Sequence, residues 1–153
     1  MEETLIILKP SAIQRSLVGE VVSRFEKKGL QIIGIKMMVL SDNILKEHYA
    51  HLVEKPFFER IKKSMQVSPV IVMALKGVDA VKVVREMSGT TNGRTAVAGT
   101  IRGDYSMSVQ ENIIHASDTP ENAKVELMRF FKNEELFEYS LITLCSLYAN
   151  DEY

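Results

Sequence analysis

The sequence predicts an α+β protein with a ferredoxin-like fold, in which helices pack on a four-stranded antiparallel sheet. Two continuous apolar runs, Thr4–Leu8 and Pro69–Leu75, are typical of strands in the interior of a sheet. Segments with helical spacing alternate with these runs and with two further candidate strands. With 153 residues, 46% of them hydrophobic, we expect one domain over residues 1–153 with helices on one face of the sheet.

The first half of the chain begins with a strand that ends at Lys9-Pro10, where the charged head of Lys9 can point into a cleft. Apolar residues that recur every four positions predict the next helix, which Gly29 ends: Ile13, Leu17, Val21 and Phe25. The β-branched stretch Leu30–Leu40 predicts a second strand. Ser41-Asp42 then begins a helix that runs through residues 48–50, and a helix after Pro56 runs to about residue 67.

The second half contains a helix between Gly77 and Gly89, followed by about twenty residues without helical or strand periodicity. A connection of that length in a compact domain points to function. The pair Ile113-Ile114 predicts the last short strand. Asp118, Pro120 and Glu121 stand where a cap, a first-turn proline and a capping-box acid begin the next helix. The tail from Asn133 is apolar enough to pack on the body or on a neighbouring subunit.

Charge and composition exclude several classes of partner. The formal net charge of −1 gives no basic face, so we expect no specific nucleic acid and no membrane as a partner. The single Cys145 excludes an internal disulfide and fits a reducing compartment. Because the chain also has no signal-like segment and no apolar run that could span a bilayer, we expect it to be cytoplasmic.

The stretch Gly99–Asp118 carries the chemistry that this sequence offers. It contains a guanidinium (Arg102), an amide (Asn112) and an imidazole (His115), which together can hold phosphate oxygens and attack phosphorus. His115 stands between a short strand and a helix start, where its position alone favours a structural role. Its neighbours favour a nucleophile.

Glu126 is one of those neighbours, because the spacing of its helix puts this carboxylate beside the buried stripe. A carboxylate there needs a donor, and Ser117 and the His115 ring are the natural candidates. Arg85, Arg102 and Lys9 form a phosphate clamp if they meet in one cleft, and Thr91 adds a hydroxyl donor. The chain has no P-loop motif.

Other residues have ordinary structural interpretations. Tyr49 and Phe57 are plausible core aromatics, although Phe57 follows a helix-breaking proline and an exposed ring there can stack on a nucleobase. We interpret His48 and His51 as ordinary residues of a surface helix. A metal pair at that spacing has no carboxylate or cysteine nearby in the sequence to complete it, so we predict no protein metal site.

The chain resembles the nucleoside diphosphate kinases over nearly its whole length. The strongest part is Asn112-Ile-Ile-His-Ala-Ser-Asp118, preceded by Gly99-Thr-Ile-Arg-Gly-Asp104. Further matching blocks are Lys9-Pro10, Gln14-Arg15, Leu17–Glu20, Arg24–Glu26, Lys28-Gly29, His48–Ala50, Lys55–Phe58, Ser68–Val70, Gly89 and Thr91-Asn92.

The resemblance implies a ping-pong kinase, in which His115 takes the γ-phosphate of a nucleoside triphosphate, typically ATP, and passes it to a nucleoside diphosphate. It implies phosphate and ribose contacts for Lys9, Arg85, Thr91, Arg102 and Asn112, and base stacking for Phe57. It also implies that Tyr49 lies close to the lysine and the histidine, and that Ser117 and Glu126 support the histidine. Mg²⁺ would arrive on the nucleotide phosphates. A homo-oligomer is implied, a hexamer in preference to a tetramer.

The sequence departs from the family's pattern at several positions without losing a catalytic group. Ser11-Ala12 replace Asp-Gly, Gly93 and Ala98 replace prolines of the long loop, Ala116 replaces a glycine and Thr119 a serine. The loop that loses its prolines packs at subunit contacts in the family. Ala116 requires a backbone conformation that accepts a Cβ atom.

Three other functions compete with the kinase. A regulatory nucleotide-binding module would keep the pocket without turnover, and the complete set of Lys9, Arg102, Asn112 and His115 argues against it. A histidine phosphatase calls for an Arg-His-Gly motif that is missing here. A nucleic-acid-binding module lacks a basic face. Without the resemblance, the residues alone indicate a phosphate-handling enzyme.

Overall fold

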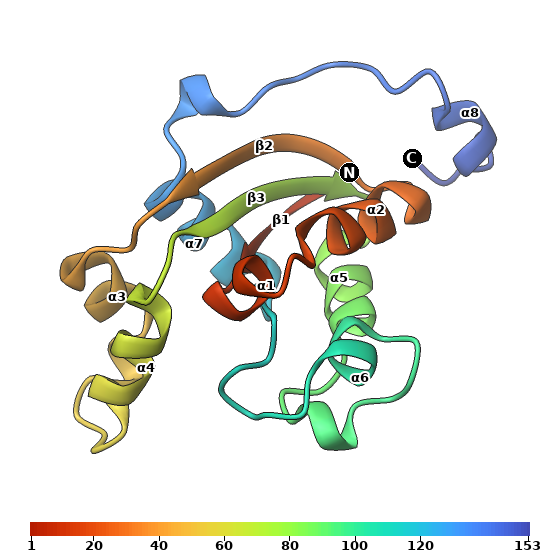
Figure 1. Ribbon diagram of the computed structural model, residues 1–153. Helices are drawn as coiled ribbons and strands as arrows, with labels where there is room; N and C mark the ends of the chain where they lie inside the picture. Colours follow the sequence, from red (N-terminus) through yellow and green to blue (C-terminus); the bar gives the residue numbers. More distant parts are fainter.

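The computed structural model describes residues 1–153 and contains one four-stranded sheet in the order β2-β3-β1-β4 (Figure 1). The central strands are β1 (Glu2–Leu8) and β3 (Val70–Gly77), with β2 (Gln31–Met38) beside β3 and the short β4 (Ile114–Ala116) beside β1. All three pairings are antiparallel. This topology confirms the predicted ferredoxin-like fold.

Helices cover both faces of the sheet, so the expectation of a single covered face is wrong. Two helices, α2 (Val18–Lys28) and α5 (Ala80–Ser88), contribute to the core on one face. On the other face the core receives side chains from α3 (Asp42–His48), α4 (Phe58–Gln66) and α7 (Pro120–Phe130). The physical reason lies in β1, whose residues 4 to 8 have no exposed surface and whose residues 5 to 8 alternate between the two cores.

Three helix starts show how local sequence sets the boundaries. The helix expected from residue 13 is divided into α1 (Pro10–Gln14) and α2 because Ser16 has a left-handed φ of 56°. Ser41 caps α3 as predicted, accepting from the Ile44 amide at 3.3 Å. Asp118 does not cap α7. Thr119 does, since Pro120 occupies the first helical position and fixes the cap one residue before it.

The long connection after residue 89 is ordered by two short elements, η2 (Gly93–Thr95) and α6 (Ile101–Tyr105). Neither is long enough to produce a periodic pattern, which is why the sequence did not predict them. The Thr100 hydroxyl caps α6 by accepting from the Gly103 amide at 3.0 Å. This connection lies below α5 and beside the chain that leads into β4 (Figure 1).

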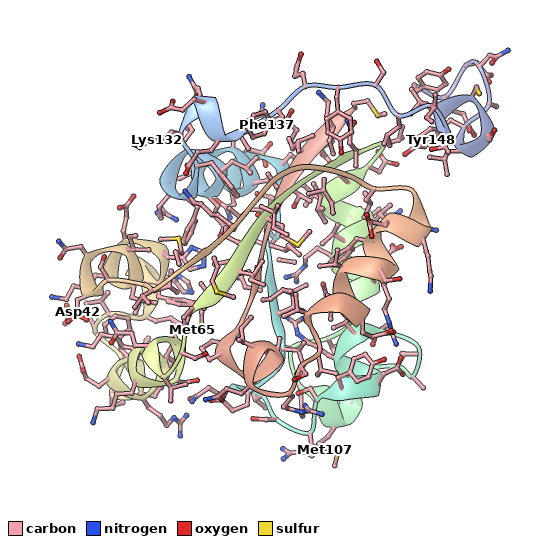
Figure 2. The ribbon with its side chains drawn as sticks, turned by 45° about the horizontal axis from the view of Figure 1, so that its top comes forward. Asp42, Met65, Met107, Lys132, Phe137 and Tyr148 are labelled. Carbon is pink, nitrogen blue, oxygen red and sulfur yellow. The ribbon has the colours of Figure 1, made fainter.

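The C-terminal tail packs on the body of the molecule. It contains η3 (Asn133–Glu135) and α8 (Leu144–Leu147). One other short element, η1 (Ala50–Leu52), lies elsewhere, directly after α3. The amide of Phe137 donates to the Ile33 carbonyl of β2 at 2.8 Å, so the tail follows one end of this edge strand (Figure 2). None of the helices has both the length and the apolar character that crossing a membrane requires.

Candidate active site

A cleft of about 630 Å³ brings together most of the residues that the sequence singled out. Its lining includes Lys9, Tyr49, Arg85, Thr91, Arg102, Asn112, His115 and Glu126. Ser117 lies behind this lining, in contact with Glu126. Phe57 is not part of the lining. It stands at the N-cap of α4 with 39% of its surface exposed.

A strained turn sets the position of His115. In β4, His115 pairs with Ile7 of β1, so its backbone belongs to the sheet. Ile113, the residue directly before β4, has a φ of 73°, which a β-branched residue rarely adopts. The Ile114 amide donates to the Asn112 carbonyl at 2.8 Å and closes this tight turn. Such a conformation costs about 1–3 kcal/mol and persists because the surrounding packing holds it.

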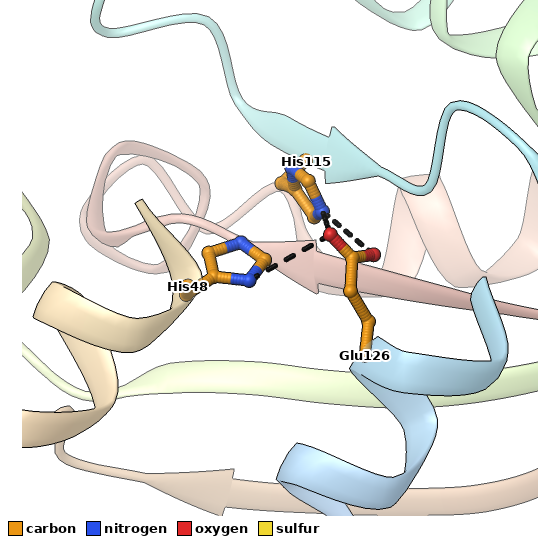
Figure 3. Close-up of side chains that lie close together, drawn as sticks. All are labelled: His48, His115 and Glu126. Carbon is orange, nitrogen blue, oxygen red and sulfur yellow. Dashed lines mark hydrogen bonds and ion pairs between the residues drawn. The ribbon is translucent and has the colours of Figure 1, made fainter. Parts of the chain in front are cut away.

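Glu126 of α7 fixes one nitrogen of the His115 ring. Both carboxylate oxygens lie 3.1 Å from Nε2 of His115 (Figure 3). The Ser117 hydroxyl donates to Oε2 of the same carboxylate at 2.5 Å. Burial alone raises the pKa of Glu126, but the hydrogen bonds from His115 and Ser117 outweigh it and lower the pKa below its usual value. The carboxylate is therefore ionised and holds a proton on Nε2. Nδ1 of His115 has no protein partner.

Lys9 lies at the exit of β1, as the sequence suggested. Its Nζ donates to Oδ1 of Asn112 at 2.6 Å and to the Gln110 carbonyl at 3.3 Å. Burial, followed by the nearby Arg102 cation, lowers the pKa of Lys9 to about 8, against a smaller opposing effect of Glu111. An anion that enters the cleft would therefore strongly stabilise the charged form of Lys9.

Arg102 has both a structural and an electrostatic part in the cleft. It is 5% exposed and donates to the carbonyls of Gly89, Asn112 and Ile114 at 2.6, 3.3 and 2.7 Å. Because arginine has five N–H donors, these three bonds leave two for a ligand. Burial, followed by the positive charge of Arg85, lowers the pKa of Arg102 to about 10, so it remains charged at neutral pH.

The remaining predicted residues differ in exposure and in how many of their polar atoms are already hydrogen-bonded within the protein. Arg85 and Thr91 are exposed at the cleft. Asn112 is fully engaged, because its amide nitrogen donates to the carbonyls of Thr91 and Val109 at 3.0 and 2.8 Å while its oxygen holds Lys9. Burial, with a further contribution from Glu126, raises the pKa of Tyr49, which therefore stays a neutral phenol.

Sequence reasoning missed two residues that meet here, His48 and Arg129. His48 is 8% exposed, and its Nδ1 lies 3.7 Å from Oε1 of Glu126. Arg129 donates to that same Nδ1 at 3.4 Å. The interpretation of His48 as a surface residue is wrong. One signal existed, since Leu45 and His48 are three residues apart and share the buried face of α3.

The grouping of His48, His115 and Glu126 is the one place where ligand atoms of metal-binding types come within 4.8 Å of one another. Each of these atoms already has a partner in the network, and the Arg129 cation lies beside them. The arrangement is accordingly that of a hydrogen-bonded brace for one imidazole. The position after His115 presents no conflict, because Ala116 lies in β4 without a positive φ.

Comparison with known proteins gives one consistent family. The model of the family "Nucleoside diphosphate kinase" matches residues 2–136. A nucleoside diphosphate kinase from Parabacteroides distasonis is 67% identical over 153 residues and covers the whole of both chains. One from Pyrococcus horikoshii is 50% identical over 141 residues, which is 90% of each chain.

Solved structures agree with this. A nucleoside diphosphate kinase from Halobacterium salinarum, in complex with CDP, is 36% identical and superimposes with a TM-score of 0.93, over 96% of this chain and 98% of that one. The unliganded enzyme from Encephalitozoon cuniculi is 38% identical with a TM-score of 0.92, over 97% and 100% of the two chains.

Proposed function

The chain belongs to the nucleoside diphosphate kinase family, and we infer that His115 is the group that carries phosphate between its two substrates. The activity is transfer of the terminal phosphate from a nucleoside triphosphate to a nucleoside diphosphate. One observation carries the assignment to His115: Glu126 occupies Nε2 and leaves Nδ1 without a protein partner in a cleft lined by cations.

The reaction has two displacements. In the first, the lone pair on Nδ1 of His115 attacks the γ-phosphorus, an N–P bond forms, and the bond to the β-phosphate oxygen breaks with release of a diphosphate. The ring keeps its proton on Nε2 and becomes cationic, and the ionised Glu126 stabilises that charge. In the second, a phosphate oxygen of another diphosphate attacks the same phosphorus and the N–P bond breaks.

Three cations supply the electrostatic part. We propose that Lys9, Arg85 and Arg102 bind the phosphate oxygens and stabilise charge as the γ-phosphoryl group moves. The two uncommitted N–H groups of Arg102 and the lowered pKa of Lys9 support this proposal. Thr91 adds a hydroxyl donor at the same end of the cleft.

The neutral residues have positioning and recognition roles in this proposal. Asn112 orients Lys9 through its 2.6 Å hydrogen bond, and the half-buried Tyr49 lines the same cleft as His115. The Halobacterium relative was solved with CDP, which supports a nucleotide in this cleft. Phe57 would stack on the base, since its exposed ring offers a π-face that selects no particular base.

Enzymes of this family need a divalent metal, and we propose Mg²⁺ brought in by the substrate. Lys9, Arg85 and Arg102, which line the cleft, are N–H donors that suit phosphate oxygens and repel a free cation. The ion would therefore be held by the nucleotide, where it neutralises charge on the phosphates. Activity should disappear on chelation and return when Mg²⁺ is added back.

The test of the proposal is phosphate exchange by the wild type and by His115→Asn. The wild type should become labelled by γ-labelled ATP, in an acid-labile form, and pass the label to several nucleoside diphosphates. His115→Asn should do neither while still binding nucleotide. Equal labelling of the variant would refute the assignment of the nucleophile.

We propose further that the chain forms a homo-oligomer, with six subunits preferred to four by family resemblance. The outer edge of β2 supports assembly, because this strand pairs only with β3. Its side chains at Ile35 and Met37, and the following Val39, are more than half exposed. Light scattering measures the mass, and Met37→Lys should reduce it.

We also propose that the enzyme acts in the cytoplasm. Cys145 is exposed and unpaired, which fits a reducing compartment. Fractionation of cells that produce the protein, with activity followed in each fraction, tests this proposal.

A further inference from the structure

A second imidazole competes for the carboxylate that braces the nucleophile. The rings of His48 and His115 meet edge to face, with centroids 4.5 Å apart and planes at 80° (Figure 3). Nδ1 of His48 lies 3.7 Å from the Glu126 oxygen that also faces Nε2 of His115. A proton on this Nδ1 would let His48 donate to Glu126 and weaken its hold on His115.

Arg129 occupies the nitrogen through which His48 would compete. It lies three residues after Glu126 on the same side of α7, and its Nη1 donates to Nδ1 of His48 at 3.4 Å. Its Nε donates to Oε1 of Glu47 at 2.9 Å, which anchors the guanidinium. Since arginine is never an acceptor, Nδ1 of His48 must present its lone pair and the ring proton must be on Nε2.

We propose that Arg129 is a positioning residue that keeps His48 neutral and in the Nε2–H form, and so reserves Glu126 for His115. This inference rests on the proposed role of His115 as the nucleophile. Arg129 acts through His48 and makes no contact with His115 itself. The Nε2 atom of His48 is buried without a hydrogen-bond partner, so the contact with Arg129 must offset the cost of leaving that N–H unsatisfied.

The charges around His48 define the expected pH dependence. His115 faces it from β4, Glu126 and Arg129 from α7, and His51 from η1. Burial, followed by His115, lowers the pKa of His48 to about 3, with Arg129 and His51 acting in the same direction and Glu126 against them. Removing Arg129 takes away a cation and also frees Nδ1, and both changes favour the protonated ring. His48 then pairs with Glu126 as the pH falls.

The experiment compares Arg129→Gln with Lys124→Gln, a matched control that removes an exposed cation from the same helix. The single-turnover rate of phosphoenzyme formation is measured from about pH 3 to 8, a range that includes the pKa of about 3 of His48. In Arg129→Gln the acid limb of this pH–rate profile, where the rate falls as the pH is lowered, should move to higher pH by about one unit. One neighbouring charge shifts a pKa by at least about this amount. Because Arg129 also lines the cleft, each rate is taken at saturating ATP. Lys124→Gln should follow the wild type.

The double variant His48→Phe/Arg129→Gln shows whether the effect passes through His48. Phenylalanine keeps an aromatic ring without a titrating nitrogen, so the acid limb should return to its wild-type position. A second variant, Glu47→Gln, loosens Arg129 without removing its charge and should move the limb in the same direction by less.

Nitrogen NMR of the wild type tests the tautomer without any substitution, and should show His48 protonated on Nε2 only. The inference is overturned by a proton on Nδ1 of His48, by an Arg129→Gln profile that matches the wild type, or by a shift that persists in the double variant. Failure of the proposed function is distinguishable, because the wild type itself would then form no phosphoenzyme.

Discussion

Glu126 presents both of its carboxylate oxygens to a single nitrogen of His115, each at 3.1 Å. The two groups come from different elements, β4 and α7, so the sheet and the helix packed on it determine the distance between them. This relationship makes the two ring nitrogens of His115 chemically different. Nε2 is committed to the protein, and Nδ1 is left without a protein partner.

Replacing Glu126 by Gln should slow phosphoenzyme formation by about 10- to 100-fold. The change removes a charge-assisted hydrogen bond worth about 1.5–3 kcal/mol to the cationic intermediate. Rapid-quench measurement with labelled ATP gives the rate. Ser117→Ala removes only the hydroxyl that donates to this carboxylate and should have a smaller effect. A Glu126→Gln rate equal to that of the wild type would show that the carboxylate does not act on His115.

Lys9 should make nucleotide binding and stability depend on pH. With a pKa of about 8, Lys9 loses its charge above that pH, and affinity for ATP should fall. Binding near pH 8 should take up a proton, which calorimetry in buffers of different ionisation enthalpy detects. In the unfolded chain the pKa of Lys9 is 10.5, so between pH 8 and pH 10.5 the unfolded state binds more protons than the folded state. The free energy of unfolding therefore increases as the pH rises through this range. Lys9→Met should abolish both effects, and their persistence would assign them to another group.

Variants of Arg102 and Arg85 should differ in their effect on protein stability but not in their effect on ATP binding. Arg102→Met removes three hydrogen bonds to backbone carbonyls and should lower the free energy of unfolding by about 3 kcal/mol. Arg85→Gln, on an exposed side chain, should change stability by less than about 0.5 kcal/mol. Both should weaken ATP binding. Denaturant titration and calorimetry measure the two properties, and equal stability of the two variants would contradict this division.

Gly93 should be intolerant of a side chain. A Cβ atom at this position would lie 2.3 Å from the Ser106 carbonyl oxygen, so Gly93→Ala should destabilise the protein by about 1–3 kcal/mol. The matched control is Gly19→Ala in α2, where no atom lies within 4 Å and a gain of about 0.5–1 kcal/mol is expected. Thermal unfolding compares them. A Gly93→Ala protein as stable as Gly19→Ala would show that the loop yields at Ser106.

The sequence predicted those parts of the fold that local patterns determine. The apolar residues 4 to 8 are a buried strand, and the stripe of α7 is where spacing put it. Because all five residues are buried, helices must cover both faces of the sheet. The expectation of helices on one face did not take this burial into account. The five-residue α6 has too few turns to leave a period, and the cap of α7 depends on the proline rather than on Asp118.

The site was predictable where its members are close in sequence, and not where packing brings distant elements together. His115, Ser117 and Glu126 lie within twelve positions, on one strand, the connection after it and the helix that follows. His48 and Arg129 meet them only because α3 packs beside α7, as the contact between Glu47 and Arg129 shows across 82 positions. No local pattern carries that information.

The position of the phosphate on the enzyme tests the central claim most directly. Phosphorus and nitrogen NMR of the protein after reaction with ATP identifies both the residue and the ring atom that carry it. The geometry around Glu126 predicts phosphate on Nδ1 of His115 with a proton retained on Nε2. Phosphate on Nε2, or on any other side chain, would contradict it.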